Sequence, residues 1–300
     1  MNPNAQSAGP GGRQAARAPG AFQASSGGAA RRLIVNADDF GLSHEVNEAV
    51  ILAHREGILT TASLMVAEAG FEEAVHLAAE NPTLGVGLHV TLLMGRSVLP
   101  PAKIPALVDS NGRFSDDPVW TGMRFFFNRR LRDQLRAEIH AQFEKFRRTG
   151  LRLDHVNGHL HLHLHPVIFE ILMEDAKELG IRHFRFTRDC LRRSRKMARG
   201  RWIYRFSHAA IYDWLSRRAR EPLRRRGIRH AEISFGLLQD ARVDEQYVLK
   251  LLRDLPEGDS ELYSHPSLNN FRHEFEALIS PRVRELVETL GIQRIRYQDL

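Results

Sequence analysis

Two adjacent carboxylates, Asp38 and Asp39, stand at the end of an apolar run and could do chemistry together. The run, residues 32–37, is typical of a buried strand, and Gly41 follows the acidic pair. Adjacent like charges are costly at a strand end unless a cation joins them or one of them stays protonated. A metal ion meets this need, with one carboxylate as its ligand and the other free to act as a base. In the alternative interpretation, Asp39 or Ser43 merely caps the next helix.

Histidines accompany three further strand-like stretches. His89 lies within a glycine-containing stretch, residues 85–90, and His265 directly follows the stretch 261–264. A tract between Asp154 and Pro166 adds five more, namely His155, His159, His161, His163 and His165. If this tract is extended, the last four share one face, but a strand advances about 6.6 Å every two residues, so only one or two of them can bind the same ion. His-rich tracts usually bind metal, and a merely polar strand face is the alternative.

Strand-like and helix-like stretches alternate along the chain and must position these groups. The predicted strands are residues 32–37, 61–66, 84–90, 153–157, 183–187, 231–235, 261–264 and 294–297. The predicted helices are residues 44–56, which follow the N-cap Ser43, and 71–80, 130–149, 166–179, 244–254 and 271–290. Such alternation favours a mostly parallel sheet with helices outside, and about eight units favour an α/β fold of the (β/α) barrel type, regular or irregular, over an open sheet.

In such a barrel the carboxyl ends of the strands meet on one face, where active sites collect. Asp38, Asp39, His89, His159 and His265 all lie near predicted carboxyl ends. One carboxylate and two histidines leave coordination positions open, as in a catalytic metal site. A second carboxylate and a further histidine can move protons, so the pattern indicates hydrolysis of an amide or ester. Non-haem iron oxygenases use the same ligands, but on antiparallel scaffolds that this chain does not resemble.

The predicted domain organisation is a disordered tail over residues 1–30 and a single barrel domain over residues 31–300. The tail contains 9 Ala, 6 Gly, 3 Pro and 3 Ser and lacks the apolar run of a secretory signal. An insertion at residues 96–128 carries Trp120, Phe125, Phe126 and Phe127, and is either a lid or a packed surface excursion. No apolar run reaches the length needed to cross a bilayer, and a cytoplasmic location is expected.

The net charge of +7 is concentrated in one basic segment, residues 191–230. This segment holds 14 Lys and Arg against 2 acids, and mixes arginines with aromatic residues. It is either a helix with one face on the core or a basic amphipathic helix that lies on an anionic membrane. Nucleic acid is not expected as a partner, because the rest of the chain is mildly acidic. The lone Cys190 excludes an internal disulfide framework.

The chain resembles the YdjC-like carbohydrate deacetylases from about Arg32 to Leu300. The resemblance rests on Asn36-Ala37-Asp38-Asp39-Phe40-Gly41, Thr61-Ala62-Ser63-Leu64-Met65, Gly87-Leu88-His89 and Ser264-His265-Pro266. The family commonly has an aspartate where this chain has Asn157. That difference, with Gly112-Arg113-Phe114-Ser115-Asp116 and Glu138-Ile139-His140-Ala141-Gln142-Phe143, is similar to the hopanoid-biosynthesis-associated branch called HpnK.

The resemblance implies a TIM-barrel-like deacetylase fold and one divalent metal ion, zinc or magnesium. It implies Asp39, His89 and His159 as metal ligands, Asp38 as the base that activates water, and His265 as the acid at the departing amine. His161 is the alternative to His159 or a substrate contact. Arg185 is expected to face the sugar or the oxyanion, and an ordinary surface arginine is the alternative.

The branch implies an N-acetylglucosaminyl hopanoid as substrate, with acetate released at the cytoplasmic side of the inner membrane. An anionic membrane is then a candidate peripheral partner of the basic segment. A deacetylase of a soluble N-acetylated oligosaccharide, a hydrolase of another amide or ester, and a non-catalytic lipid-binding protein are the alternatives. The sequence leaves the oligomeric state open, a homodimer included.

Overall fold

The computed structural model describes residues 29–197, 200–239 and 241–300. The tail predicted over residues 1–30 therefore lies almost wholly outside the described residues. Within the described ranges, no helix is both long enough and apolar enough to cross a membrane.

Seven parallel strands form one sheet at the centre of the described chain. They are β1 (Arg31–Phe40), β2 (Thr61–Leu64), β3 (Gly85–Val90), β4 (Leu153–Gly158), β5 (Ile233–Phe235), β6 (Gly258–Ser264) and β7 (Gln293–Ile295). Their order is β4-β3-β2-β1-β6-β5, with β7 paired to the first half of β1. Residues 33–40 of β1 are buried throughout, as expected for a central strand covered on both faces.

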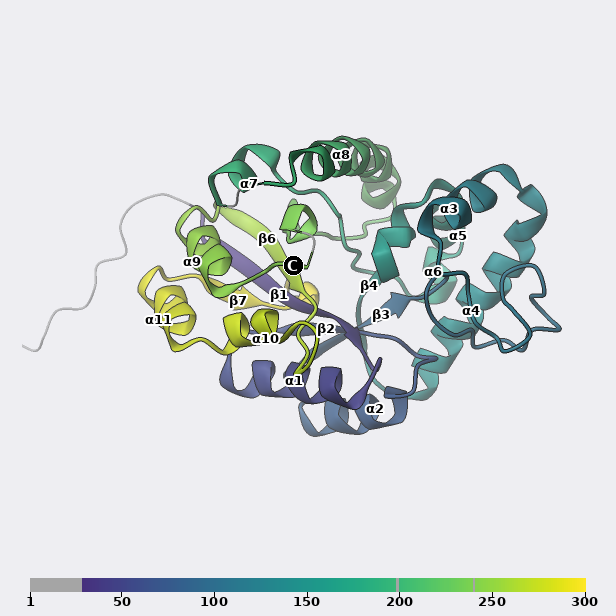
Figure 1. Cartoon of the computed structure of the whole chain (residues 1–300), viewed down its shortest axis with the longest axis horizontal. Coiled ribbons are helices and arrows are strands. Elements are labelled where there is room, and N and C mark those ends of the chain that lie inside the picture. The colour runs from purple at the N-terminus through teal and green to yellow at the C-terminus, as the bar shows by residue number, and fades with distance from the viewer. Residues whose placement is uncertain (1–28, 198–199, 240) are drawn as a thin grey trace, which may run out of the picture.

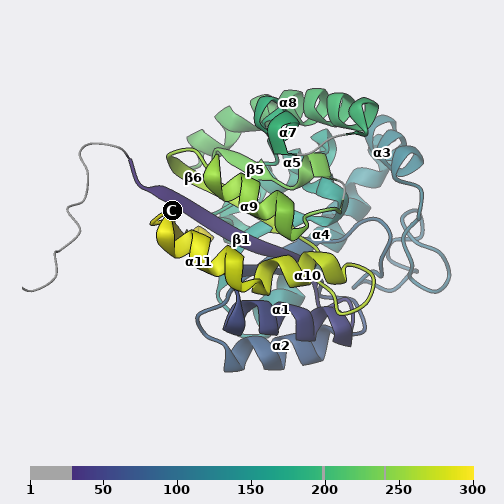
Figure 2. The same cartoon turned by 60° about the vertical axis from the view of Figure 1, so that its left-hand side comes forward.

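Helices cover the outside of this curled sheet (Figures 1 and 2). They are α1 (His44–Glu56), α2 (Phe71–Glu80), α3 (Pro118–Phe127), α4 (Arg132–Arg148), α5 (Pro166–Glu174), α6 (Ala176–Leu179), α7 (Leu191–Met197), α8 (Trp202–Arg225), α9 (Glu245–Arg253), α10 (Arg272–Ile279) and α11 (Pro281–Thr289). Ser43 caps α1 as predicted, by accepting from Val46 N. The helix predicted over residues 271–290 is two helices, because Pro281 cannot continue α10 and instead begins α11.

The prediction of an irregular barrel is confirmed, since the sheet curls but does not close through a regular strand. Residues 183–187, predicted as a strand, contribute two isolated parallel bridges, Phe184 to Val156 of β4 and His183 to Arg229. Further along, Ser234 N of β5 donates to Arg188 O. The segment 182–188 thus links β4 to β5 with too few bonds to form a ladder, so the fold is a curled half-barrel.

The insertion of residues 96–128 is an ordered excursion that leaves the carboxyl end of β3 and ends in α3. Two polar side chains of α4 hold its start: Glu138 accepts from Val98 N and Leu99 N, and Gln142 bonds both backbone groups of Thr91. Burial raises the pKa of Glu138. The two residues belong to the 138–143 block singled out in the sequence, so that block fixes the insertion beside the carboxyl ends of the strands.

Candidate metal centre and active site

A local irregularity in β1 brings both carboxylates to the same face. In a regular strand, Asp38 and Asp39 would point to opposite faces. Here Asp39 has φ 64°, in the left-handed region, and β1 carries one extra residue relative to β2 between Ala37 and Phe40. Such a bulge re-aims side chains, and the next residues turn sharply at Gly41, whose φ is 91°.

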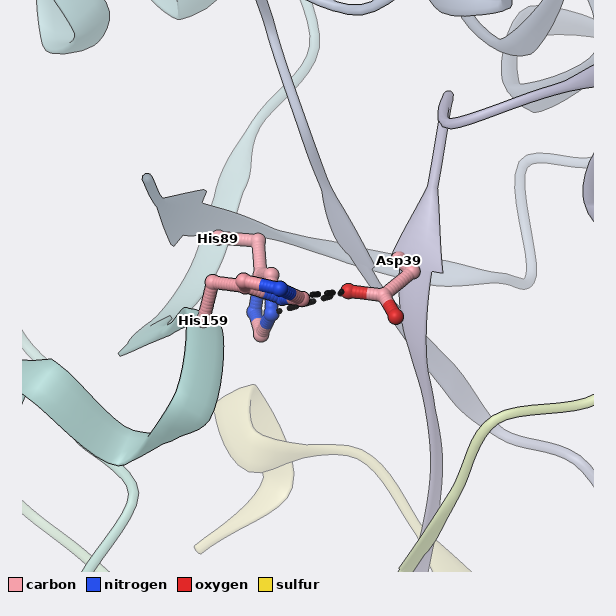
Figure 3. Close-up of side chains that lie close together, drawn as sticks. All are labelled: Asp39, His89 and His159. Carbon is pink, nitrogen blue, oxygen red and sulfur yellow. Dashed lines mark hydrogen bonds and ion pairs between the residues drawn. The ribbon is translucent and has the colours of Figure 1, made fainter. Parts of the chain in front are cut away.

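Asp39, His89 and His159 form a compact group at the carboxyl ends of β1, β3 and β4 (Figure 3). Asp39 Oδ1 lies 3.2 Å from His89 Nε2 and 2.9 Å from His159 Nδ1. One ligand atom from each residue falls within 4.8 Å of the others. Burial alone raises the pKa of Asp39, but the two imidazoles lower it well below its usual range. The structure therefore brings together the three residues that the family resemblance implied as metal ligands.

Asn157 fixes which nitrogen of His89 faces Asp39. Its Nδ2 donates to Asp38 Oδ1 at 3.1 Å and to Ser63 Oγ at 2.8 Å, so its Oδ1 faces His89 Nδ1 at 2.7 Å. That nitrogen must carry the proton, which leaves the Nε2 lone pair directed at a carboxylate oxygen. Two acceptors at 3.2 Å need a cation or a proton between them. The donor set fits a divalent metal, with the second ring nitrogen of His89 held as ligating histidines usually are.

Arg185 is fully buried and holds Asp38 with two hydrogen bonds. Its Nη1 donates to Asp38 Oδ2 at 2.7 Å and its Nη2 to Oδ1 at 2.9 Å, while its Nε donates to Glu261 Oε1 at 2.8 Å. Burial raises the pKa of Asp38, but Arg185 and His89 lower it by more than burial raises it, so the net shift of the pKa is strongly downward. We expected Arg185 to face the sugar or the oxyanion; the geometry instead places it, fully buried, as a positioning residue behind Asp38.

A buried polar chain supports this arrangement from beneath. Asp154 Oδ2 lies 3.0 Å from His155 Nδ1, and His155 Nε2 lies 2.9 Å from Ser63 Oγ. Ser63 in turn accepts from Asn157 and from Asn36, whose Nδ2 also reaches Asp38 at 2.8 Å. Because Ser63 accepts two amide donors, its own hydroxyl proton is directed to His155. The chain fixes the amide orientations on which the tautomer of His89 depends.

The histidine tract is not extended beyond β4, so its histidines do not share the single face that an extended tract would give. It forms a short 3-10 segment, η2 (His159–Leu164), in which Leu160 and His161 have positive φ, 49° and 58°. The chain must turn here because Pro166 begins α5. His161 Nε2 lies 2.8 Å from the Tyr263 hydroxyl, and His161 is not part of the group formed by Asp39, His89 and His159, so the geometry favours His159 as the candidate ligand.

The remaining histidines of the tract serve the fold. His163 is buried against Arg185 O, and burial together with the Arg185 charge lowers its pKa to about 3. His165 precedes α5 and its Nε2 lies 3.0 Å from Gly122 O of α3. Both contacts position neighbouring segments and leave these imidazoles outside the metal group.

His265 ends β6 on the opposite side of the site and remains partly open to solvent. Its side chain is 28% exposed, and its Nδ1 lies 3.6 Å from Glu274 Oε2, an ion-pair rather than a hydrogen-bond distance. The same oxygen accepts His265 N at 2.5 Å. Burial lowers the pKa of His265, but Glu274 and the two aspartates raise it to about 9. His265 is therefore protonated at neutral pH.

Sequence reasoning missed Glu261 and Glu274, the two buried carboxylates that hold Arg185 and His265. Both are fully buried, at 0% exposure. A signal was available for Glu261, because a charged residue inside an otherwise apolar strand needs a buried partner. Asp38, Asp39 and Glu261 carry three negative charges against the one of Arg185. A divalent cation at Asp39 would balance the excess.

Known proteins resemble this chain in sequence and in fold. A sequence profile described as YdjC-like protein matches residues 32–289. The chain belongs to this family. It is 44% identical to a carbohydrate deacetylase of Brevibacillus brevis over 152 residues, and 39% identical to a chitooligosaccharide deacetylase of Proteus mirabilis over 153 residues. These alignments cover 50% and 51% of the chain and only 57% and 58% of the relatives, less than two thirds of their length.

A solved structure shares the fold over nearly the whole YdjC-like chain. It is an Enterococcus faecalis protein provisionally described as a cellobiose-phosphate cleavage protein. The TM-score is 0.71 at 23% identity, and the match covers 90% of this chain and 99% of the other. This likeness establishes the architecture of the YdjC-like domain.

Proposed function

We propose that this protein is a metal-dependent carbohydrate N-deacetylase that hydrolyses an N-acetyl group and releases acetate. One observation carries the proposal: a compact Asp-His-His group lies beside a carboxylate that a buried arginine keeps ionised. The names of the Brevibacillus and Proteus relatives support the same reaction class.

Asp39, His89 and His159 would hold the metal ion. When bound, it would polarise the amide carbonyl and lower the pKa of water. The two histidines favour zinc or another transition metal, whereas magnesium prefers oxygen ligands. The cation would also replace the proton that the close pair of Asp39 and His89 otherwise requires.

Asp38 would accept the proton of the attacking water. It is ionised throughout the neutral range because Arg185 lowers its pKa. Its Oδ1 accepts from Asn36, Asn157 and Arg185, whereas within the described structure Oδ2 accepts from Arg185 alone. Oδ2 is therefore the oxygen with a lone pair left for water.

His265 would donate the proton that the leaving nitrogen needs. Water oxygen bonds to the carbonyl carbon, the C–N bond breaks, and the nitrogen departs as a free amine with the proton from His265. The raised pKa of about 9 keeps this proton on the imidazole before the step. General acid–base catalysis of this kind contributes roughly 10²–10⁴ in rate.

We further propose an N-acetylglucosaminyl hopanoid as the substrate, acted on at the cytoplasmic side of a membrane. Asn157 and the blocks at residues 112–116 and 138–143 support this choice, through their similarity to the hopanoid-associated branch. A soluble N-acetylated oligosaccharide is the second candidate, favoured by the name of the Proteus relative.

The test is acetate release from both substrates, with and without chelator, by the native chain and by Asp38→Asn. We expect chelator-sensitive release that Asp38→Asn lowers by about 10²-fold or more while still binding metal. Glu285→Gln, which removes an exposed carboxylate on α11, is the charge-matched control and should behave as native. Absence of chelator-sensitive release from either substrate would refute the proposal. Release from the oligosaccharide alone would refute the lipid assignment.

A further inference from the structure

Exposed apolar side chains gather around the mouth of the site. Among the described residues, thirteen large hydrophobic side chains are exposed, and eleven of them lie in α3, η2 and α8. The other two, Leu42 and Met94, follow the carboxyl ends of β1 and β3. The eleven are Val119, Trp120, Met123, Phe126, Phe127, Leu160, Trp202, Ile203, Phe206, Ile211 and Trp214, here called the apolar rim.

The α3 part of the rim is a continuous helix face. Its five residues recur with spacings of one, three and four, which places them together on one side of the helix. Phe127 is 78% exposed, and the Phe126 and Phe127 rings meet edge to face at 5.0 Å. The opposite side of α3 is anchored, since Phe125 is buried and Gly122 O lies 3.0 Å from His165 Nε2. The aromatic face is therefore held outward.

The α8 part combines an apolar stripe with a basic end. Ile203, Phe206 and Trp214 share one side of the helix, and Ile203 is 88% exposed. The second half presents exposed arginines on the same helix, Arg217, Arg218, Arg220, Arg224 and Arg225. The exposed Arg129 and Arg130 likewise follow α3. Each apolar face is thus followed by positive charge.

Both helices border the site. α3 and α8 pack against the same helix, α5, and lie next to each other in both views (Figures 1 and 2). Between them lies η2, which begins at the candidate ligand His159. His165, just after η2, lies 3.0 Å from Gly122 O of α3, and Tyr212 of α8 donates to Leu160 O at 3.4 Å. A surface that bound the rim would therefore lie at the entrance to the metal group.

We propose that the apolar rim docks this protein on an anionic lipid bilayer, with the rim side chains in the interfacial layer and the arginines at lipid phosphates. Scattered exposed apolar residues are normal, but a contiguous apolar patch marks an interaction surface. Aromatic residues combined with arginines are what interfacial helices present to anionic lipid. A second copy of this chain fits less well, because a two-fold interface would place the same arginine clusters against each other.

The docking goes beyond the proposed reaction, because it requires neither metal nor substrate. The full chain is mixed with vesicles of equimolar phosphatidylcholine and phosphatidylglycerol that contain no glycolipid, and binding is measured by flotation. We expect binding that falls with added salt and is weak on pure phosphatidylcholine vesicles. A failed deacetylase assay would leave this result unchanged, so the two proposals fail separately.

Three paired variants test the rim. Phe126→Ser with Phe127→Ser, and Ile203→Ser with Phe206→Ser, should each weaken vesicle binding by about tenfold or more. Arg217→Ser with Arg218→Ser should weaken binding by roughly tenfold or more and flatten the salt dependence. Arg147→Ser with Arg148→Ser, at the far end of α4, is the charge-matched control and should bind as native. Circular dichroism confirms that each variant is folded.

Three results would overturn the proposal. The native chain could fail to float with anionic vesicles, or the α4 control could lose as much affinity as the α8 arginine pair. Light scattering could also show a dimer that dissociates in the two variants with apolar-to-serine substitutions, in which case the rim is an interface between copies of the chain.

Discussion

Asp38 and Asp39 are neighbours with the same carboxyl group, yet the protein surrounds them in opposite ways. Asp38 receives hydrogen bonds from Arg185, Asn36 and Asn157, and its side chain is 3% exposed. Asp39 meets the imidazole nitrogens of His89 and His159, and its side chain is 12% exposed. Asp38 is held by donors on both oxygens, with one lone pair of Oδ2 left, whereas Asp39 needs a metal ion or an imidazolium beside it.

The contrast shows how one edge of a sheet can hold two roles. The left-handed backbone at Asp39 and the bulge beside it turn both side chains toward one site. Their partners then give the two carboxylates different roles. The buried guanidinium of Arg185 holds the negative charge of Asp38 in place, whereas the imidazole nitrogens beside Asp39 can bind a cation together with it. Substitutions that exchange or remove these partners test the two roles directly.

The largest effect is expected from Asp39→Asn. Asparagine tolerates the left-handed backbone, so the fold should persist, but the anionic ligand is lost. We expect metal binding to fall below one ion per chain and acetate release to fall by at least about a thousandfold. Elemental analysis of the purified protein and an acetate assay measure the two quantities. Full metal occupancy in Asp39→Asn, or a loss of metal in Asp38→Asn, would contradict the assignment of roles.

Arg185→Met should mainly cost stability. It leaves Asp38 and Glu261 as unpaired buried charges, and breaking a buried pair in this way typically costs about 3–5 kcal/mol of unfolding free energy. Urea denaturation measures it. Arg272→Met, which removes an exposed pair with Glu276 on α10, is the control and should change stability by less than about 1 kcal/mol.

The pH dependence of this loss sharpens the test. Without Arg185, the pKa of the buried Asp38 rises in the folded state, because the guanidinium that lowers it is gone, so the folded state binds more protons than before. The variant should therefore be less destabilised at about pH 5 than at about pH 8. A loss that is equal at both values would show that the missing packing, and not the missing charge, is responsible.

The gathering of Asp38, Asp39, His89, His159 and His265 could be predicted because parallel strands end at one edge. The choice of Asp39, His89 and His159 as ligands came from the family resemblance. The path of the histidine tract could not be predicted, since alternating His and Leu fit a strand as well as a turn with two left-handed residues. The buried position of Arg185 could not be predicted, because its partner Glu261 lies 76 residues away in the sequence and contacts it only once β6 has joined the sheet. The sequence could not decide whether the aromatic faces of α3 and α8 point outward, because aromatic helix faces usually pack inward.

Asn157→Asp tests the residue that contacts both Asp38 and His89, a candidate metal ligand beside Asp39. An aspartate can still accept from His89 Nδ1, so metal affinity should stay within about tenfold of native. It can no longer donate to Asp38 or Ser63 and adds a third carboxylate, so kcat should fall by roughly 10–100-fold. Metal titration and steady-state kinetics separate the two effects. If metal affinity falls while kcat holds, Asn157 serves the ligand side alone.

The smallest change is expected from Glu274→Gln, which removes the buried charge beside His265. The acid must be protonated, so activity declines as pH rises through the pKa of His265, which is about 9 in the native chain. Removing the Glu274 charge lowers that pKa, because the charge favours the imidazolium, and the alkaline limb of kcat/KM should move to lower pH with little change below neutrality. Glu276→Gln removes an exposed charge on the same helix and should leave the limb in place. An unmoved limb in Glu274→Gln would mean that another group donates the proton to the amine, and His265 would then be left as a neighbour of the site.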